Sequence, residues 1–217
     1  MKKGAAFKKG LFITVEGGEG AGKSTCLEYI KQLLQGKGIE SVFTREPGGT
    51  ELGEEVRGIL LNKEHMGMAA DTELLLMFAA RAEHIDKKIL PEINAGKWVI
   101  SDRFTDATYA YQGAGRGIDP QRVGVIEDWV QGELRPDMTL LLDLPVKIGM
   151  ERASKRGELD RFEVEQMSFF ERVAVIYRQR AQNEPERFRI IDASKTIPEV
   201  QEQIKLVFTE KFAQLRL

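Results

Sequence analysis

The chain has 217 residues, of which 42% are hydrophobic and 30% charged, a composition typical of a globular protein and a length that suits one α/β-sized domain. Lys and Arg total 32 against 34 Asp and Glu, and this net charge of -2 argues against a nucleic-acid polymer as partner, because such surfaces need a basic excess. The single cysteine, Cys26, excludes an internal disulfide framework and suits a reducing cytoplasm, and no apolar run approaches the roughly 18 residues of a membrane span.

Short β-type runs alternate with helical patterns along the chain. The runs cover residues 11–15, 41–44, 98–100, 138–144 and 188–191. Helices are expected at about 22–35, from the Pro47 turn to 61, at 71–94, at 119–130 and after 196. This alternation predicts an α/β fold with a five-stranded parallel sheet flanked by helices. Residues 1–10 are expected to form a disordered lead, and residues 11–217 a single domain.

Three of these helices carry capping signals, at Asp71, at Asp119 followed by Pro120, and at Thr196 followed by Glu199. The long helix that begins at Asp71 is expected to tolerate Pro91 late in its course. A few residues outside the motifs also carry expectations. Cys26, Trp98 and Trp129 are expected to pack in the interior, and His65 and His84 to lie at the surface.

A glycine-rich segment follows the first predicted strand directly. Gly17-Gly18-Glu19-Gly20-Ala21-Gly22-Lys23-Ser24 fits the pattern G-x-x-x-x-G-K-[ST] of a phosphate-binding loop in the strand–loop–helix context that the pattern requires. Its glycines allow several backbone N–H groups to point at one phosphate chain, near the positive end of the next helix. Lys23 is expected to reach the β- and γ-phosphates, and the Ser24 hydroxyl to ligate Mg²⁺. The segment therefore predicts binding of a nucleoside triphosphate.

Two polar segments follow the second and third predicted strands, at the edge of the sheet where such folds bind ligands. The first runs from Thr44 to Thr50 and contains Arg45; the second is Ser101-Asp102-Arg103-Phe104. Asp102 can hold the water shell of a metal ion, and Arg103 can bridge phosphates. The chain has no Asn-Lys-x-Asp segment of the kind that reads guanine in GTPase switches, and its length leaves little room for the partner domains of a motor. These observations favour a small kinase.

A further group of residues could form a pocket for a base. Phe78 lies three residues before Arg81, and Met77 four, so either side chain can share a helical face with the guanidinium. Three polar residues share another face at i, i+3 and i+4: Thr108, Tyr111 and Gln112. An aromatic ring, a guanidinium, an amide and a hydroxyl are the groups that stack on a base and bond its edge. Without further information, a Phe at helical spacing is more often part of a core.

Six segments carry a resemblance that covers the chain from about Leu11 to its C-terminus. They are GGEGAGKS, TREPGGT, LLLMFAAR, SDRFTDATYAYQGAGRG, RPD before the fourth strand, and RASKRGELDRFE. Together they closely resemble bacterial thymidylate kinase, and TREPGG and DRFTDATYAYQG are specific to that family. The resemblance implies the P-loop nucleoside monophosphate kinase fold, a cytoplasmic homodimer, and Mg²⁺-dependent transfer of the ATP γ-phosphoryl group to thymidine 5'-monophosphate (dTMP). The products would be dTDP and ADP, in dTTP biosynthesis, with no membrane partner.

The resemblance also implies roles for residues near the phosphates and the sugar. Arg45 and Arg103 match the clamp on the acceptor phosphate, with Lys23, Asp102 and Arg103 in catalytic positions. Glu19 matches the carboxylate that accepts from the sugar 3'-hydroxyl, and Tyr111 the aromatic residue that disfavours a ribose 2'-hydroxyl. The ATP-binding set is the phosphate loop and the residue after it: Gly17, Gly18, Glu19, Gly20, Ala21, Gly22, Lys23, Ser24 and Thr25. Ser24, and Asp102 through water, would hold the Mg²⁺.

Four residues match the family's recognition of thymine. Phe78 would stack on the base, and Arg81 would donate to its exocyclic oxygen. Thr108 and Gln112 match the positions that read the base edge. In some relatives the stacking aromatic lies four residues before the arginine, where this chain has Met77, so the sequence leaves the register of this contact open.

Residues at about 151–163 resemble the family's lid, the segment that closes over the phosphates. The family divides into members with an arginine inside the phosphate loop and members that supply it from the lid. This chain has Glu19-Gly20 in the loop and four cations in the lid: Arg152, Lys155, Arg156 and Arg161. It therefore resembles the lid-arginine subtype, and we expect Arg156 to be the catalytic lid residue.

Two other functions remain open from the sequence. A kinase for another nucleoside monophosphate would keep the phosphate loop and the lid but should lack the set of Arg81, Thr108 and Gln112. A non-kinase nucleotide-binding module would hydrolyse ATP slowly and show no dependence on an acceptor. Acceptor-dependent release of ADP separates these alternatives.

Overall fold

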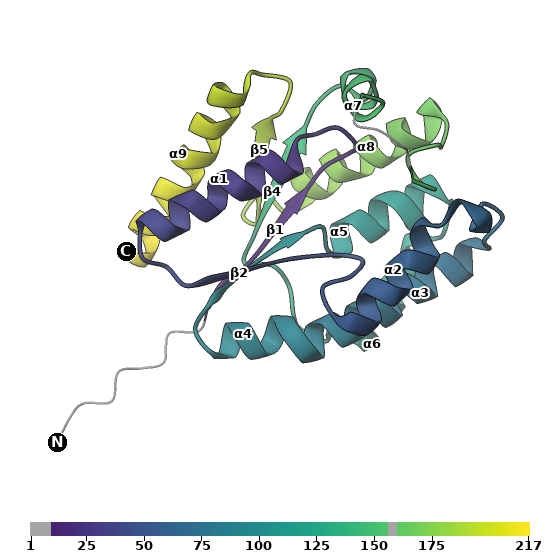
Figure 1. Ribbon diagram of the computed structural model, residues 1–217, viewed down its shortest axis with the longest axis horizontal. Helices are drawn as coiled ribbons and strands as arrows, with labels where there is room; N and C mark the ends of the chain where they lie inside the picture. Colours follow the sequence, from purple (N-terminus) through teal and green to yellow (C-terminus); the bar gives the residue numbers. More distant parts are fainter. Residues whose placement is uncertain (1–9, 156–159) are drawn as a thin grey trace.

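The computed structural model describes residues 10–155 and 160–217, and this part of the chain contains one parallel sheet of five strands (Figure 1). The strands are β1 (Phe12–Glu16), β2 (Ser41–Arg45), β3 (Trp98–Asp102), β4 (Met138–Asp143) and β5 (Phe188–Asp192). Their order is β2-β3-β1-β4-β5, and every neighbouring pair is parallel. The predicted fold class and the positions of all five strands are confirmed.

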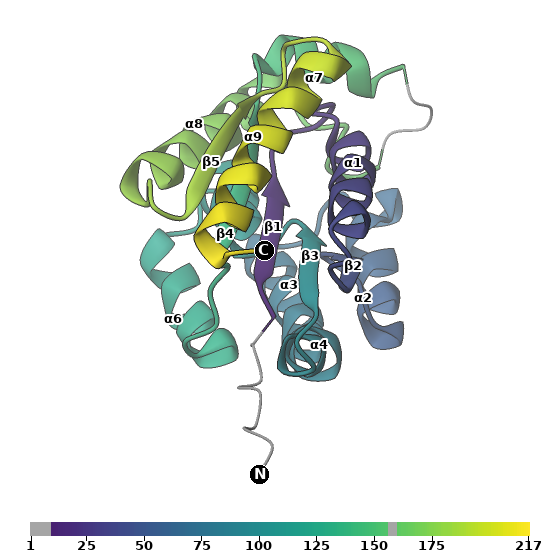
Figure 2. The ribbon, with the colours of Figure 1, turned by 90° about the vertical axis from the view of Figure 1, so that its left-hand side faces the viewer.

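The two faces of the sheet are both buried, as a parallel sheet requires. Successive residues of a strand point to opposite faces, so Ile13 and Val15 pack under the helices of one face while Phe12 packs on the other. Figures 1 and 2 show α1 (Lys23–Gly36) and α9 (Ile197–Leu215) side by side over the first face. The opposite face carries the layer that contains α8 (Met167–Asn183).

The remaining α-helices are α2 (Glu51–Leu61), α3 (Ala70–His84), α4 (Leu90–Asn94), α5 (Thr105–Thr108), α6 (Pro120–Gln131) and α7 (Val146–Ala153), and a short 3-10 helix, η1 (Lys63–His65), lies between α2 and α3. A π-helical segment, η3 (Tyr109–Gly115), continues α5, and another, η2 (Ile85–Ile89), joins α3 to α4. Helices α7 and α8 were not anticipated from the sequence. The segment η2 ends at Ile89, two residues before Pro91. The helix therefore changes its hydrogen-bonding register close to the proline, which has no backbone N–H to donate.

The capping signals have mixed outcomes. Asp119 accepts a hydrogen bond from Gln121 N at 2.8 Å, and the capping box of Thr196 and Glu199 is present. The prediction that Asp71 is an N-cap is wrong, because α3 begins at Ala70 with Ala69 as its cap. Asp71 instead lies in the first turn, where a negative charge also suits the helix dipole.

The predicted lead of residues 1–10 needs a correction at its last residue. Residues 1–9 lie outside the described residues, but Gly10 is buried and donates to Ile93 O at 3.0 Å. A Cβ atom at this position would lie only 1.8 Å from Lys97 O, so only glycine fits the close approach. Gly10 therefore belongs to the fold.

Three expectations about single residues are confirmed and two are wrong. Cys26 and Trp98 are buried and His65 is exposed. His84 is completely buried instead of lying at the surface, because it bonds Thr44 and Glu46 in the interior. Trp129 is 84% exposed instead of packed. Within residues 10–155 and 160–217, no helix is both long and apolar enough to cross a membrane.

Candidate active site

A cavity of about 700 Å³ lies against the residues that follow β1, β2 and β3. The phosphate loop after β1 contributes residues 19–24, the segment after β2 contributes Glu46, and the segment after β3 contributes Arg103. The strand order changes direction at β1, which pairs with β3 on one side and β4 on the other. Open parallel sheets bind ligands at such a switch point. The sequence motifs therefore meet where the topology forms a crevice.

The phosphate loop has the backbone that its glycines permit. Gly17, Gly20 and Gly22 have φ angles of 145°, 67° and 86°, which L side chains rarely adopt. A Cβ atom on Gly20 would lie 1.9 Å from Gly149 O, so the loop also packs too closely for any other residue. The Lys23 ammonium lies 3.3 Å from both Gly17 O and Gly18 O and so folds back over the loop. Burial, followed by the charge of Arg103, lowers the pKa of Lys23.

Arg103 is held in a strained position at the end of β3. Its φ is 69°, in the left-handed region that non-glycine residues enter at an energetic cost. Its guanidinium donates to Gly17 O at 3.0 Å and to Glu19 Oε1 at 2.7 Å, and Nη1 also lies 3.2 Å from the Tyr177 hydroxyl. The predicted catalytic arginine is therefore fixed against the phosphate loop.

Glu19 and Tyr111 lie together beside Arg103. The Tyr111 hydroxyl donates to Glu19 Oε1 at 2.8 Å, and the Arg103 guanidinium lies 4.7 Å from the centre of the Tyr111 ring. All three line the cavity. Burial raises the pKa of Tyr111 well above its ordinary value, so its hydroxyl remains a donor. The structure thus brings together the two residues predicted to contact the sugar.

The predicted metal-binding residues fit Mg²⁺. Ser24 and Asp102 line the cavity, and Asp102 Oδ1 is buried with no hydrogen-bond partner among residues 10–155 and 160–217. An orphaned carboxylate oxygen at this point is suited to accept from the water shell of a cation. The described residues contain no group of three or more His, Cys, Asp and Glu that could hold a metal. Mg²⁺ needs none when it binds mainly to phosphates and waters.

Arg81 is a buried cation that also lines the cavity. Its Nε donates to Glu46 Oε2 at 2.7 Å and its Nη2 to Thr108 Oγ1 at 2.9 Å. His84 Nδ1 donates to the second oxygen of Glu46 at 2.9 Å, which holds that carboxylate in place. Arg81 Nη1 is buried, and the described part of the chain offers it no acceptor. A buried donor left open on a cavity wall is suited to a ligand's carbonyl oxygen.

The structure resolves the choice between Met77 and Phe78. Met77 lines the cavity, whereas Phe78 is only 2% exposed and packs with Leu74, Ile118 and Val123. The prediction that Phe78 stacks on the base is therefore corrected. Neighbouring residues of a helix differ by about 100° in direction, so only one of the two can face the cavity. Phe78 instead lies under the guanidinium of Arg81, with 4.7 Å from ring centre to Cζ.

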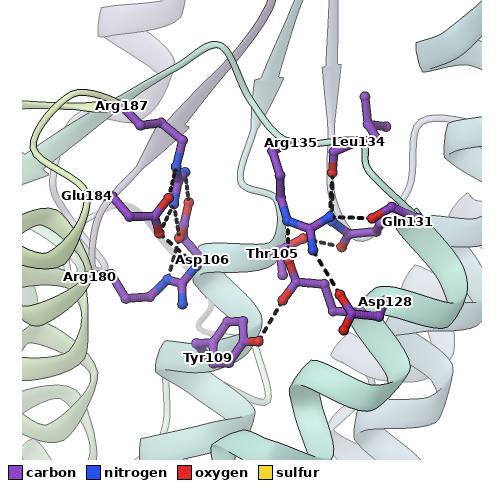
Figure 3. Close-up of polar contacts among 12 residues, drawn as sticks. Thr105, Asp106, Tyr109, Asp128, Gln131, Leu134, Arg135, Arg180, Glu184 and Arg187 are labelled. Atoms are coloured by element: carbon purple, nitrogen blue, oxygen red, sulfur yellow. Dashed lines mark hydrogen bonds and ion pairs between the residues drawn. The ribbon is translucent and has the colours of Figure 1, made fainter.

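Gln112 and Thr108 both line the cavity, as predicted for residues that read a base edge. They lie on η3 and α5, and a buried polar layer anchors these segments to α6 and α8 (Figure 3). In that layer Asp106 pairs with Arg180 and Arg187. The neighbouring Tyr109 donates to Glu127 at 2.6 Å. The two residues predicted to read the base edge therefore project from segments that these polar contacts join to the rest of the fold.

Arg57 lines the cavity, whereas Arg45, which the sequence predicts as part of the clamp on the acceptor phosphate, does not. The side chain of Arg45 is 53% exposed, pairs with Glu54 at 2.7 Å and is not among the residues that line the cavity. Arg57 lines the cavity, and its Nη1 donates to Pro47 O at 2.9 Å. Burial, followed by the charge of Arg45, lowers the pKa of Arg57. The feature of the sequence that could have identified Arg57 is its position about two turns into the helix that starts after the Pro47 turn.

The predicted lid cations have different positions. Arg156 lies outside the described residues, and Lys155 is exposed. Arg152 lines the cavity, and its Nη1 donates to Ala193 O at 2.8 Å. Arg161 is 1% exposed and pairs with Glu73 at 2.7 Å, so it serves as a buried anchor and not as a mobile lid cation.

One wall of the cavity was not anticipated. It is formed by residues at the end of β5 and the start of α9, among them Ala193, Thr196, Ile197 and Val200. The signal that could have found it is the capping box at Thr196, since it follows the fifth strand at the same edge of the sheet.

Comparisons with known proteins all point to one family. A family model described as thymidylate kinase matches residues 15–204. A thymidylate kinase of Pseudomonas putida is 56% identical over 195 residues, which cover 90% of this chain and 93% of the relative. A thymidylate kinase of Alkalilimnicola ehrlichii is 55% identical over 193 residues, covering 88% of this chain and 89% of the relative. The crystal structure of thymidylate kinase from Ehrlichia chaffeensis superposes with a TM-score of 0.73 at 33% identity, covering 92% of this chain and 99% of that one.

Proposed function

The chain belongs to the thymidylate kinase family of nucleoside monophosphate kinases, and we propose that its cavity binds dTMP at the Arg81 end and ATP at the Lys23 end. The enzyme transfers the γ-phosphoryl group of ATP to dTMP, giving dTDP and ADP in dTTP biosynthesis. The observation that carries the assignment of the two ends is that one continuous cavity is lined by both the phosphate loop and the set of Arg81, Thr108 and Gln112.

The acceptor pocket follows from the contacts of its walls. Arg81 Nη1 would donate to the exocyclic oxygen of thymine, and Met77 would pack on the face of the base. Glu19, with Tyr111 beside it, would accept from the 3'-hydroxyl of the sugar. Tyr111 also occupies space on the sugar side, which would disfavour a ribose 2'-hydroxyl.

Charge neutralisation and alignment would supply most of the catalysis. A phosphate monoester is ionised near neutral pH, so the acceptor needs no general base. Lys23 would hold the β- and γ-phosphates, and Arg103 would bridge the two phosphate chains from its fixed position beside the loop. Arg57 would bind the acceptor phosphate, with Arg45 too far into solvent to share that contact. Arg152 and the wall at the start of α9 would enclose the nucleoside of ATP.

Mg²⁺ is the cation that these residues would hold. The Ser24 hydroxyl would be a direct ligand, and Asp102 Oδ1 would accept from a coordinated water. Bound there, Mg²⁺ would neutralise charge on the transferring phosphates. Residues at about 151–163 would act as the lid, with Arg156 as the arginine that reaches the transferred group. Lid closure would exclude water and limit hydrolysis of ATP.

We also propose that the enzyme is a cytoplasmic homodimer. Val125 and Trp129 are 71% and 84% exposed, lie four residues apart on α6 and so share a face. Leu75, which is 56% exposed, lies on α3, and α3 packs against α6. A second copy of the chain would cover this apolar surface. Sedimentation of the native protein as a dimer and of Trp129→Glu as a monomer is the expected result; a monomeric native protein would exclude the proposal.

A coupled assay of ADP release tests the function and its alternatives together. The rate is measured with dTMP and with the monophosphates of deoxyuridine, deoxycytidine, deoxyadenosine and deoxyguanosine in turn. Acceleration by dTMP well above the others is expected. Equal acceleration by all acceptors would indicate a less selective kinase, and no acceleration would indicate a nucleotide-binding module.

A further inference from the structure

Glu73 is a completely buried carboxylate that lies behind the cavity wall, next to the residue proposed to read the base edge. It comes from the first turn of α3 and is not among the residues that line the cavity. Gln112 Nε2 donates to its Oε1 at 2.8 Å. Two guanidinium groups, of Arg116 at 3.2 Å and Arg161 at 2.7 Å, pair with its Oε2. These two partners hold a negative charge that would otherwise be very unfavourable in the interior.

The contact with Glu73 determines which end of the Gln112 amide faces the ligand. A carboxylate paired with two arginines only accepts hydrogen bonds, so the amide must turn its NH₂ group toward Glu73. The carbonyl oxygen, Oε1, lies on the other branch of the same planar group. Because Gln112 lines the cavity and its Nε2 is directed at Glu73, Oε1 would be the amide atom available to a ligand there.

Arg81 provides the complementary donor on the same wall. Glu46 and Thr108 bind its Nε and Nη2, and Nη1 remains without an acceptor in the described part of the chain. The wall thus offers a donor from Arg81 and an acceptor from Gln112. Neither group can reverse its character, since a guanidinium has no acceptor and Glu73 prevents the amide from flipping.

This order of donor and acceptor matches one class of pyrimidine. Thymine and uracil present a carbonyl oxygen at position 4, which accepts, and an N–H at position 3, which donates. Cytosine presents an amino group at position 4 and an unprotonated nitrogen at position 3, which is the reverse order. A cytosine placed in the same pose would set donor against donor and acceptor against acceptor, leaving buried polar groups unpaired.

We propose that Glu73 is a specificity-determining positioning residue, which makes the enzyme select 4-oxo over 4-amino pyrimidines by fixing the orientation of the Gln112 amide. The inference rests on the proposed function of Arg81 and Gln112 as readers of the base. Glu73 acts through Gln112 and does not touch the substrate.

The test compares dTMP with 5-methyl-2'-deoxycytidine monophosphate, which differs from dTMP only at the edge in question. In Glu73→Gln the new amide can accept or donate, so Gln112 is free to flip. The ratio of kcat/KM for dTMP to kcat/KM for the 5-methylcytosine analogue is expected to fall by roughly 10-fold or more, the scale of one misread hydrogen-bonded edge. A general loss of packing would lower both values and leave the ratio unchanged, which would overturn the proposal.

Glu165→Gln is the matched control. Glu165 also pairs with Arg116, and the same substitution removes the same charge, but the Gln112 amide donates to Glu73 and not to Glu165. We expect the ratio in this variant to stay within about twofold of the native value, a difference too small to count as a change of specificity. An equal fall in Glu165→Gln and Glu73→Gln would show that loss of charge near Arg116, and not orientation of Gln112, changes specificity, and would overturn the proposal.

A second variant keeps the test decisive if Glu73→Gln does not fold. Gln112→Met keeps the length of the side chain and removes the amide, so the ratio should fall to a similar extent; a native ratio in this variant would overturn the inference. The native enzyme distinguishes a failure of the proposed function from a failure of the proposed role of Glu73. If it fails to prefer dTMP over the 5-methylcytosine analogue, the proposed reading of the base by Arg81 and Gln112 is wrong. If it has the preference and Glu73→Gln keeps it, the role of Glu73 alone is wrong.

Discussion

Glu19 Oε1 accepts a hydrogen bond from Arg103 Nη2 at 2.7 Å, although the two residues lie 84 positions apart in the chain. The contact joins the phosphate loop after β1 to the segment after β3. Both side chains are only partly exposed, at 13% and 16%, so the pair is weakly screened by solvent. The loop and the arginine therefore form one unit, and changes to either should affect turnover more than folding.

Replacement of Lys23 or Arg103 by Ala should lower kcat by at least about 10²-fold, the scale that is typical when a transition-state donor is removed. Steady-state assays with saturating dTMP and ATP measure this effect. Arg216→Ala, at the exposed end of the chain, is the control and should keep native turnover. Near-native kcat in either site variant would show that the residue does not stabilise the transferred phosphoryl group.

Arg57→Ala should raise KM for dTMP by roughly 10-fold or more, because it removes a charge-assisted contact with the acceptor phosphate. Arg45→Ala is the matched comparison, since Arg45 belongs to the adjacent strand but pairs with Glu54 in solvent. Its KM should change much less. A larger rise in KM for Arg45→Ala than for Arg57→Ala would support Arg45 as the residue that binds the acceptor phosphate, as the sequence predicts, and would argue against that role for Arg57.

Met77→Ala and Phe78→Ala should separate binding from stability. Phe78→Ala should lower the free energy of unfolding by about 3 to 5 kcal/mol, because it leaves a cavity in a packed cluster. Met77→Ala should have a smaller effect on stability and raise KM for dTMP by roughly 5-fold, because the base would no longer pack on an apolar side chain. Urea denaturation and steady-state kinetics on both variants distinguish the two effects. If Phe78→Ala raised KM for dTMP and Met77→Ala mainly lowered stability, Phe78 and not Met77 would be the residue that packs on the base.

Arg156→Ala should lower kcat with little change in KM for dTMP, because a lid arginine would contact the transferred group and not the acceptor base. Lys155→Ala, at the neighbouring position, serves as the comparison for a general loss of lid charge. A pure rise in KM for dTMP in Arg156→Ala would contradict the proposed role.

Glu16→Gln should flatten the pH dependence of stability. Glu16 is completely buried at the end of β1, where it accepts from Phe104 N at 2.7 Å and from the Tyr177 hydroxyl at 2.8 Å. Burial, and next the charge of Asp106, raises its pKa from 4.5 to about 8. In that interval the native carboxyl keeps a proton that the unfolded chain has lost, so the free energy of unfolding falls as the pH rises from about 5 to about 8.

Urea denaturation at several pH values across that interval measures the effect. The native protein should lose stability toward the alkaline end, whereas Glu16→Gln, which carries no titrating group, should lose less. Parallel pH profiles for the two proteins would show that Glu16 does not hold the proton.

The phosphate loop, the strands and the general position of the site could be predicted because their signals are local. Gly17 to Ser24 form a contiguous pattern that specifies a backbone conformation directly, and the carboxyl ends of parallel strands always meet at one edge. For the same reason Asp102 and Arg103 were placed correctly beside the loop. The cavity wall at the start of α9 also lies after a strand, β5, at this edge of the sheet, but it is not among the site residues predicted from the sequence.

The predictions that proved wrong concern residues whose position depends on the direction of the side chain. Arg161 reads as one of four lid cations in the sequence, yet it is buried against Glu73 on a distant helix. His84 carries no local signal for burial, and its position depends on Glu46, which lies 38 residues earlier. Neither partner can be identified from spacing along the chain.

The length of 217 residues, the balanced charge and the motifs of contiguous residues were enough to predict one domain, to argue against a nucleic-acid polymer as partner and to identify the family. The three-dimensional structure was needed to show that Met77 and Arg57 line the cavity in place of Phe78 and Arg45, and that the Gln112 amide contacts Glu73. This difference arises because a motif constrains its own backbone, whereas the rotation of a helix and the partner of a buried charge depend on packing between segments far apart in the chain.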